Sequence, residues 1–374
     1  MNKKGIPLFT FRQIEVKLDY SWFIIFFLIV ITLGMYYFPH YYASMTPAVR
    51  WSISIISALL LFISVLLHEF SHSLVAQKLG IEINSIVLFV FGGVAQMKSE
   101  PEDPKSEFYI SVAGPLCSLV LGILFMGIYY LLPNQMHEAI GAVFWYIGYL
   151  NLALVAFNIL PGFPLDGGRI ARAAIWYYTD NLRKATRIVS NIGKFLAFLI
   201  IGFGLLNMLV GAFIQGLFFV FLGMFLQQAS VRGYQMVALR EGLAKISVSR
   251  IMTPDPHTVP DDITLQTLID DYFYKYKVHS FPVIKNEKPV GLVTVKSVKS
   301  VPREKWDSTL VVDIMDPLNT TNTLSPDDDA YEVLIRMIEN NVGRMPVISD
   351  NKVRGIITRK DIMEFVLMRE EIEA

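Results

Sequence analysis

Three residues at helical spacing could hold a metal ion and activate a water molecule. His68, Glu69 and His72 form the pattern H-E-x-x-H. On an α-helix, side chains four residues apart lie on one face, so both imidazoles can bind the same ion. Glu69 stands next to the first imidazole, where its carboxylate can reach a water molecule on that ion. The spacing therefore predicts a zinc site with Glu69 as the group that takes the water proton.

The surroundings of this pattern are apolar. It lies inside a hydrophobic run from Trp51 to Gly80. Ionisable side chains at membrane depth are costly, and they normally mark function. The pattern also occurs by chance on soluble helices, but its apolar context favours a zinc hydrolase whose active site lies below the membrane surface.

A catalytic zinc site needs three protein ligands and one open position for water. The candidate for the third ligand is Asp166, in the proline- and glycine-rich segment 158–169, NILPGFPLDGGR. A helix that breaks at membrane depth is tolerated where it lines a cavity. Asp166 could instead cap a helix after Pro164, but the need for a third ligand favours the metal. Asn158 could donate a hydrogen bond to the oxyanion or the substrate backbone, or satisfy backbone groups freed by Pro161.

Composition indicates a membrane protein with room for a second domain. The 374 residues are 53% hydrophobic and 18% charged, against roughly 45–50% and 25% in soluble proteins. Lys+Arg and Asp+Glu both number 33, so no overall basic charge suggests a nucleic-acid partner. The single cysteine, Cys117, excludes a disulfide framework and a thiolate metal site.

Apolar stretches of roughly 20 residues predict about six transmembrane helices. Basic residues gather before the first stretch and after the second and fourth, so the positive-inside rule predicts that both termini are cytosolic. We expect a multi-pass protein of the cell membrane. An amphipathic stretch, Leu165–Tyr178, is expected to continue the fourth span as a broken helix. The expected spans are about Tyr20–Phe38, Trp51–Val75, Phe108–Leu132, Ala139–Leu160, Ile192–Val210 and Phe213–Leu226.

The segment Ile86–Met97 is apolar and rich in β-branched residues, but it is too short to cross a membrane and contains Gly92-Gly93. It predicts a re-entrant or interfacial β-hairpin. The exposed edge of such a hairpin could pair with an unwound substrate segment. A purely structural hairpin is the alternative.

The C-terminal part contains an internal repeat. Phe281–Ile284 recurs as Met345–Ile348, and Gly291–Thr294 recurs as Gly355–Thr358, at a nearly constant offset. Each copy has a helix candidate followed by two short apolar strands, which predicts two α/β units packed as a pair. The helix candidates are Leu265–Tyr276 and Ala330–Asn340. We expect a membrane domain at 1–230, a linker or short helix at 231–245, and the pair at 246–374, with repeats at about 246–303 and 308–372.

The membrane motifs together resemble the site-2 protease family of intramembrane zinc metalloproteases. This resemblance implies zinc bound by His68, His72 and Asp166, with Glu69 catalytic. It also implies cleavage of a substrate's transmembrane segment, often after an earlier cut. In bacteria such membrane-protein substrates are frequently regulators such as anti-sigma or pro-sigma factors. The motifs that carry the resemblance are His68–His72, Gly92–Ala95, Ala113–Pro115 and Asn158–Arg169.

The repeated part resembles a tandem pair of cystathionine-β-synthase-type (CBS) domains. That family's ribose-binding pattern, Gly-h-h-[Ser/Thr]-x-x-Asp, stands in the second repeat with Thr358 and Asp361, whereas the first repeat has Ser297 in place of the aspartate. A carboxylate can accept hydrogen bonds from both ribose hydroxyls, and serine does so poorly. The resemblance therefore implies at most one strong adenine-nucleotide (ATP or AMP) site. A module for dimerisation or docking only, including a homodimer, is the alternative.

Two functions of different classes fit these observations. The first is a zinc metalloprotease acting within the lipid bilayer on a membrane protein and regulated by an adenine nucleotide. The second is a transporter or channel gated by its CBS pair, which should show inverted repeats or a polar pore. The only polar cluster in the predicted spans is the proposed metal site, so the sequence favours the protease.

Overall fold

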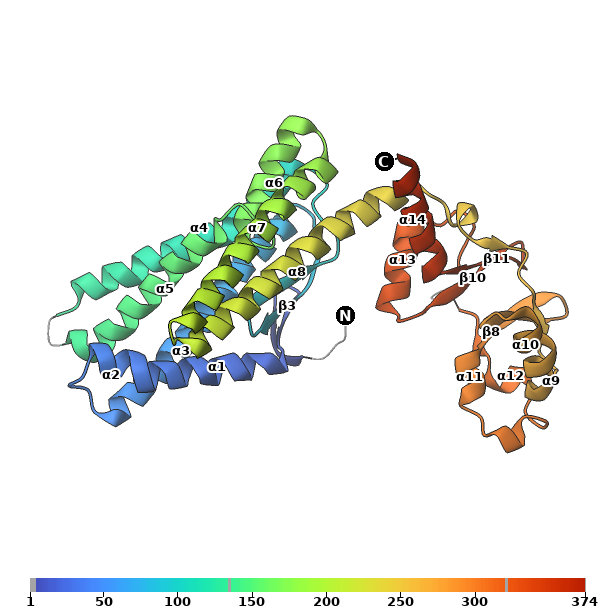
Figure 1. Ribbon diagram of the computed structural model, residues 1–374, viewed down its shortest axis with the longest axis horizontal. Coiled ribbons are helices and arrows are strands. Elements are labelled where there is room, and N and C mark those ends of the chain that lie inside the picture. Colours follow the sequence, from blue (N-terminus) through green and yellow to red (C-terminus); the bar gives the residue numbers. More distant parts are fainter. Residues whose placement is uncertain (1–4, 134–135, 320–321, 374) are drawn as a thin grey trace. The chain divides into compact units, whose positions relative to one another are not determined.

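The computed structural model describes residues 5–133, 136–319 and 322–373. The chain folds as two compact units, Asn2–Val237 and Ala238–Ala374 (Figure 1). The first contains the apolar helices, and the second contains the repeated α/β elements.

Six helices in the described part of the chain are long and apolar enough to cross a membrane. They confirm the predicted multi-pass helical fold. Large apolar side chains on them remain exposed, among them Ile24 at 70% and Ile214 at 83%, as expected for helices that contact lipid. The helical elements are α1 (Tyr20–Thr32), a π-helical turn (Leu33–Tyr37), α2 (Phe38–Tyr41), α3 (Pro47–Lys78), α4 (Pro104–Leu131), a second π-helical turn (His137–Gly141), α5 (Ala142–Asn158), α6 (Asp166–Thr179), α7 (Leu182–Leu209) and α8 (Phe213–Leu243).

Capping residues determine where two of these helices begin. Thr46 caps α3 and Asp103 caps α4 through a side-chain oxygen, and a proline occupies the first turn of both helices. These start signals extend both helices beyond the predicted apolar stretches. At its other end α8 continues to Leu243, so most of the segment 231–245 forms the last turns of that helix.

A four-stranded sheet packs against the C-terminal half of α3. Its order is β1-β2-β3-β4, with β2 and β3 parallel and the other pairs antiparallel. The predicted hairpin is present as β3 and β4, and the sequence analysis missed its two N-terminal partners. Apolar side chains of β2 and β3 pack with Phe70 and Ala76 of α3 and Ile110 of α4. The strands are β1 (Ile6–Phe11), β2 (Ile14–Leu18), β3 (Ile83–Phe89) and β4 (Gly92–Met97).

The predicted helix break lies between α5 and α6. Close backbone packing holds this loop, because a Cβ on Gly168 would lie 2.7 Å from the Phe163 amide nitrogen. Phe163 is buried, and its carbonyl accepts a hydrogen bond of 2.5 Å from the Ser230 hydroxyl of α8. The loop therefore has a defined path that delivers Asp166 to the start of α6.

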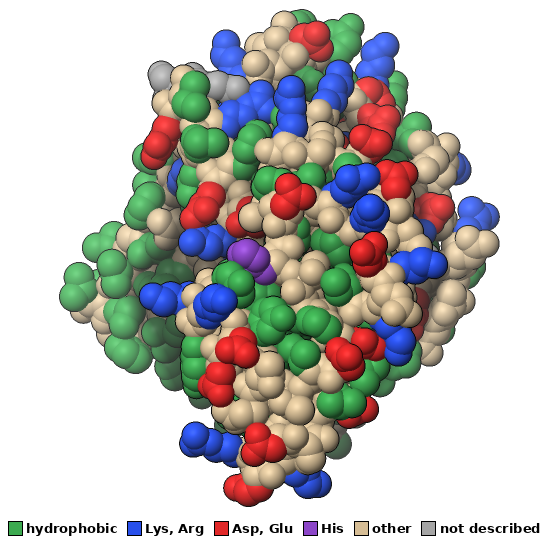
Figure 2. Space-filling model, turned by 90° about the vertical axis from the view of Figure 1, so that its right-hand side faces the viewer, with side chains coloured by type: hydrophobic (Ala, Val, Ile, Leu, Met, Phe, Trp, Pro, Cys, Tyr) green, Lys and Arg blue, Asp and Glu red, His purple; other side chains and the backbone are tan. Residues whose placement is uncertain are grey.

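The C-terminal unit confirms the predicted α/β pair. Each repeat has its own apolar core. The two sheets, of order β6-β7-β8-β9 and β10-β11-β5, exchange short strands between the repeats. Acidic and basic side chains are interspersed over the surface in Figure 2. The strands are β5 (Thr253–Pro254), β6 (Val259–Pro260), β7 (Ser280–Lys285), β8 (Lys288–Thr294), β9 (Asp316–Pro317), β10 (Arg344–Ser349) and β11 (Lys352–Thr358).

The helices of this unit flank those strands. The predicted helix at Leu265–Tyr276 is present, with a π-helical middle, and the one at Ala330–Asn340 is present as α13. The elements are 3-10 turns at Val248–Arg250 and Arg303–Lys305, α9 (Leu265–Thr267), a π-helix (Leu268–Phe273), α10 (Tyr274–Tyr276), α11 (Val295–Lys299), α12 (Val311–Ile314), α13 (Ala330–Glu339) and α14 (Arg359–Glu373).

Candidate active site

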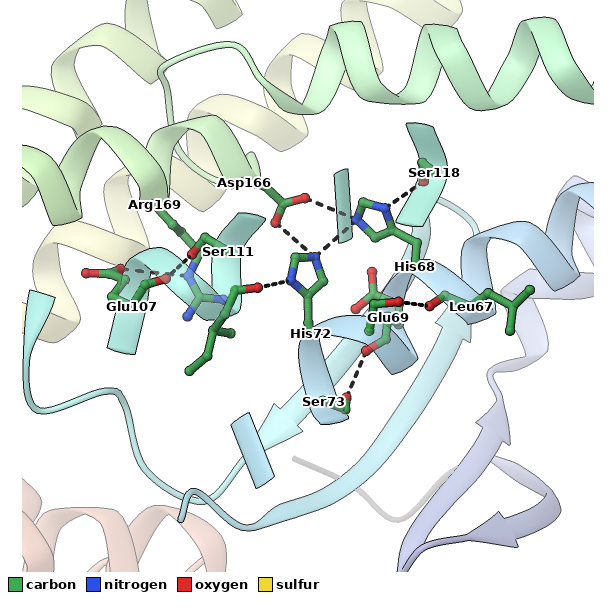
Figure 3. A network of polar contacts seen from close by, with 12 residues as sticks. Leu67, His68, Glu69, His72, Ser73, Glu107, Ser111, Ser118, Asp166 and Arg169 are labelled. Atoms are coloured by element: carbon green, nitrogen blue, oxygen red, sulfur yellow. Dashed lines mark hydrogen bonds and ion pairs between the residues drawn. The ribbon is translucent and has the colours of Figure 1, made fainter. Parts of the chain in front are cut away.

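The two imidazoles of the H-E-x-x-H pattern face the same point. His68 and His72 lie in the C-terminal part of α3, and each is only 4% exposed. Their Nε2 atoms are 3.2 Å apart (Figure 3). The helical spacing read from the sequence therefore places both rings on one buried face.

Asp166 meets these imidazoles from the first turn of α6, 98 residues after His68. Its Oδ2 lies 3.1 Å from His68 Nε2, and its Oδ1 lies 3.3 Å from His72 Nε2 (Figure 3). Ligands about 2.0–2.1 Å from a tetrahedral zinc ion lie roughly 3.3 Å from one another. The three side chains have the separations that such an ion requires.

Hydrogen bonds from α4 orient both rings. His72 Nδ1 lies 2.6 Å from the Ile110 carbonyl oxygen, and a carbonyl only accepts, so this nitrogen carries the proton. The Nε2 lone pair of His72 is then free to point toward Asp166. His68 Nδ1 contacts the Ser118 hydroxyl at 2.9 Å. Partners of this kind fix ring orientation at metal centres.

Gly114 of α4 leaves space beside the imidazoles. A Cβ at this position would lie 2.6 Å from His68 Nε2 and closer still to His72 Nε2. The two nitrogens and the carboxylate therefore converge next to a position that has no side chain. The donor set and the space both fit one zinc ion bound by two imidazoles and a carboxylate.

Glu69 belongs to α3, and its side chain faces β4 next to this cluster. The backbone of Ala95 in β4 faces the Glu69 carboxylate. A Cβ on Gly93 would lie 2.5 Å from Glu69 Cγ, so the strand backbone approaches the side chain closely. The β3–β4 hairpin thus limits where the carboxylate can move.

Asn158, the other predicted catalytic residue, is the last residue of α5 and is half-buried. Its side chain makes no hydrogen bond to the residues that the structure describes. The structure therefore places it at the helix break and leaves its contribution to the chemistry a proposal.

Sequence reasoning missed the supporting residues on α4. Glu107, Ser111 and Ser118 were not singled out; with Gly114, which lies in a motif named above, they recur every three or four residues and are all buried. Glu107 holds Arg172 of α6 through its carboxylate. A polar and small-residue stripe on an otherwise apolar helix is a signal that could have identified this face.

In the C-terminal unit, Thr358 ends β11 and Asp361 lies in the first turn of α14, and both line a cavity of about 530 Å³. The Thr358 amide donates to Asp361 Oδ2 at 2.8 Å, and the Asp361 amide donates to Thr358 Oγ1 at 3.1 Å. In the first repeat, the Ser297 amide donates to Thr294 Oγ1 at 3.1 Å. The second pair thus presents a carboxylate where the first presents a hydroxyl.

Basic side chains also line this cavity, and the sequence analysis had not singled them out. Arg344 donates a hydrogen bond of 3.0 Å to the Ser280 hydroxyl of the other repeat. Burial lowers the pKa of the Arg344 guanidinium from its ordinary value, and the Asp361 carboxylate opposes this. The other basic or imidazole-bearing residues of the lining are His257, Lys277, His279 and Lys360.

Comparison with known proteins identifies two families along the chain. Residues 56–141 and 127–200 match the sequence model of peptidase family M50, and residues 248–304 and 311–368 match that of the CBS domain. A zinc metalloprotease of Methanocaldococcus jannaschii is 32% identical over 372 residues, which cover 99% of each chain. The chain belongs to peptidase family M50.

Other known proteins are also similar to this chain. A Synechocystis protein is 30% identical over 367 residues, covering 96% of this M50 chain and 93% of the relative. The solved site-2 protease from Methanocaldococcus jannaschii is 32% identical, and its match covers 62% of this chain and 95% of that one, with a TM-score of 0.46.

Family membership confirms several predictions. The protein is a multi-pass membrane metalloprotease of the zinc-dependent M50 family, and it carries a tandem pair of CBS domains. The protease prediction is confirmed over the transporter or channel. Zinc is the metal that the family implies, and the two imidazoles and carboxylate described above suit it.

Proposed function

We propose that the protein is an intramembrane zinc metalloprotease that cleaves a peptide bond in or near the transmembrane segment of a membrane-bound regulatory protein. An adenine nucleotide at the CBS pair regulates it. The observation that carries the proposal is the convergence of His68, His72 and Asp166 at buried positions in a six-span unit. Two imidazole nitrogens and a carboxylate at such separations match the ligand set and spacing of a zinc site.

In this proposal His68, His72 and Asp166 hold the zinc ion. When bound, zinc lowers the pKa of a water molecule and polarises the scissile carbonyl. Glu69 takes the proton from the attacking water and delivers it to the leaving amide nitrogen. Asn158 donates a hydrogen bond to the oxyanion or to the substrate backbone. The Ile110 carbonyl and the Ser118 hydroxyl keep both imidazoles oriented.

The substrate requires an unwound segment, because a helical backbone hides its peptide bonds. β4 is at the edge of the four-stranded sheet, and an extended peptide can add to such an edge. The backbone of β4 also approaches the Glu69 side chain closely at Gly93. A peptide paired with β4 therefore lies beside the proposed base.

An apolar groove of about 730 Å³ lies beside the turn that precedes β4. It is formed by α1, α8 and the turn between β3 and β4. Phe91 of the turn stacks on Phe225 of α8, with ring centroids 4.4 Å apart. Because Gly93 follows two residues later, a hydrophobic segment in the groove would be close to β4 and Glu69. The groove thus fits an apolar transmembrane substrate.

Regulation is proposed at the cavity that contains Thr358 and Asp361. The Asp361 carboxylate suits ribose hydroxyls, and Lys277, Arg344 and Lys360 suit phosphate groups. Because Ser297 replaces the aspartate in the first repeat, we propose one strong site for ATP or AMP. The CBS pair could also support a homodimer.

The proposed setting is the cell membrane, with both termini in the cytosol and with anti-sigma or pro-sigma factors as a substrate class. The proposed domain division is the membrane protease at 1–230, the connecting segment at 231–245 and the CBS pair at 246–374.

The test of the protease uses full-length protein in proteoliposomes with a membrane-anchored substrate. Glu69→Gln should keep one zinc ion per chain and abolish cleavage. His68→Ala and Asp166→Ala should lose zinc as well as cleavage. Normal turnover by Glu69→Gln, or full zinc content in Asp166→Ala, would overturn the proposal.

The test of regulation compares Asp361→Ala with Ser297→Ala, the equivalent position in the first repeat. We expect Asp361→Ala to weaken ATP and AMP binding at least tenfold and to remove their effect on cleavage, whereas Ser297→Ala changes little. Equal nucleotide affinity in Asp361→Ala and wild type, measured by calorimetry, would refute this site.

A further inference from the structure

A buried ion pair joins α4 and α6, two of the helices that surround the proposed zinc site. Glu107, in the first turn of α4, is 0% exposed, and Arg172 of α6 is 5% exposed. Arg172 Nε donates to Glu107 Oε1 at 2.7 Å, and its Nη2 contacts the same oxygen. Arg169 Nε lies 3.8 Å from that oxygen (Figure 3). Charges are buried to this extent only when they are paired.

On the α4 side, this pair belongs to the face that orients the imidazoles. Three residues after Glu107, the Ile110 carbonyl holds His72, and further along the same face Ser118 holds His68. Because Glu107 and Ile110 lie within one turn of α4, fixing Glu107 also fixes the Ile110 carbonyl. α4 therefore defines the position of both rings.

On the α6 side, Arg172 contacts the structure on both sides of Asp166. It lies six residues after Asp166, about 9 Å along the helix. Its guanidinium carbon lies 5.0 Å from the ring centroid of Phe163, in the loop before Asp166. The Phe163 carbonyl is in turn held by Ser230 of α8. Arg172 therefore restrains both the helix and the loop that present the carboxylate.

We infer that the Glu107–Arg172 pair is a positioning device that sets the distance between Asp166 and the two imidazoles. This inference rests on the proposed function, in which those three residues bind zinc. Zinc–ligand distances in proteins fall within about 0.2 Å of their standard values. Without the pair, α6 can shift relative to α4 and carry Asp166 out of that range, whereas the imidazoles stay in place.

A purely stabilising pair is the competing explanation, and one double variant separates the two. Removing Arg172 alone leaves the Glu107 charge buried without its partner, which destabilises any fold. Glu107→Leu/Arg172→Met removes both charges and leaves apolar side chains of similar size. Such replacements of buried pairs are often neutral for stability, so a change in zinc binding in this variant reports positioning.

The experiment measures zinc affinity of full-length protein in lipid nanodiscs by competition with a chromogenic chelator. The visible spectrum of the cobalt-substituted protein reports coordination geometry. We expect the double variant to keep a thermal midpoint near that of the wild type, to bind zinc 10- to 100-fold more weakly and to change the cobalt spectrum. Arg172→Lys, which keeps the charge but loses the two-pronged contact, should show a smaller loss in the same direction.

The control is Ile53→Ala, a buried position on α3 about 22 Å along the helix from His68. It should lower the thermal midpoint and leave zinc affinity unchanged. Wild-type zinc affinity and cobalt spectrum in the double variant would overturn the inference. If the double variant does not fold, the same result in Arg172→Lys would overturn it. Failure of the wild-type protein to bind one zinc ion would instead refute the proposed function.

Discussion

Gly114→Ala should separate metal binding from folding within one helix. The added Cβ would lie 2.6 Å from His68 Nε2, against an ordinary contact of 3.4 Å or more. The ring must therefore move by roughly 0.8 Å, several times the range of about 0.2 Å within which zinc–ligand distances fall. His72 Nε2 is closer still, so both proposed ligands are displaced. We expect zinc affinity to fall at least 100-fold and cleavage to be lost.

The effect of the same change on folding should be small. Alanine favours a helix interior over glycine by about 0.8–1 kcal/mol, and overpacking at the rings costs about 1–3 kcal/mol. The two contributions have opposite sign, so the thermal midpoint of the metal-free protein should change by only a few degrees. A large loss of stability would show that Gly114 is needed for packing and not specifically for the metal.

Gly127→Ala is the matched control, because it lies on the same helix and its added Cβ has no atom of the described structure within 4 Å. It should gain helix stability and keep zinc and activity. The assay is zinc content per chain after dialysis, with cleavage of a membrane-anchored substrate measured in parallel. One tightly bound zinc ion and wild-type cleavage in Gly114→Ala would refute the placement of the ion beside this residue.

Two further changes test neighbouring parts of the structure. Gly93→Ala should push the Glu69 side chain away from β4, so cleavage should fall at least tenfold while zinc content stays at one ion per chain; loss of zinc would contradict the separate roles of Glu69 and the ligands. Asp103→Ala should remove the cap of α4 and lower stability by about 1 kcal/mol at neutral pH. Hydrogen bonds from Ser106 lower the pKa of the Asp103 carboxyl. The ionised carboxylate therefore stabilises the fold fully above the unfolded pKa of about 3.9, and this stabilisation is lost as the pH falls through the lower pKa of the folded state. The thermal midpoints of wild type and Asp103→Ala should therefore converge in acid, and a constant difference would exclude this role.

Local patterns explain what the sequence predicted. His68 and His72 share a helix face because their spacing matches the helical period, whatever the rest of the chain does. Mean hydropathy over about 20 residues identified the six spans, because it too depends only on residues close together in the chain. Asp166 was found because prolines and glycines mark a helix break beside an apolar stretch. The paired sequence motifs likewise indicated the CBS repeats.

The two N-terminal strands were not predicted from these local patterns. β1 and β2 precede α1, and β2 pairs in parallel with β3 near residue 86. A strand pairing across such a distance leaves no periodicity in either segment that identifies its partner. The length of α8 was also underestimated, because polar residues after Gln228 end the apolar pattern but do not end the helix.

The sequence by itself determined the spans, the two-histidine pattern, the helix break with its carboxylate and the repeated α/β pair, because each depends on residues close together in the chain. The tertiary structure alone decided that the Ile110 carbonyl and Ser118 orient the rings, that Gly114 leaves space beside them, and that Glu107 meets Arg172. These contacts join different helices. Their geometry depends on how the helices pack, and packing brings together side chains that no local pattern relates.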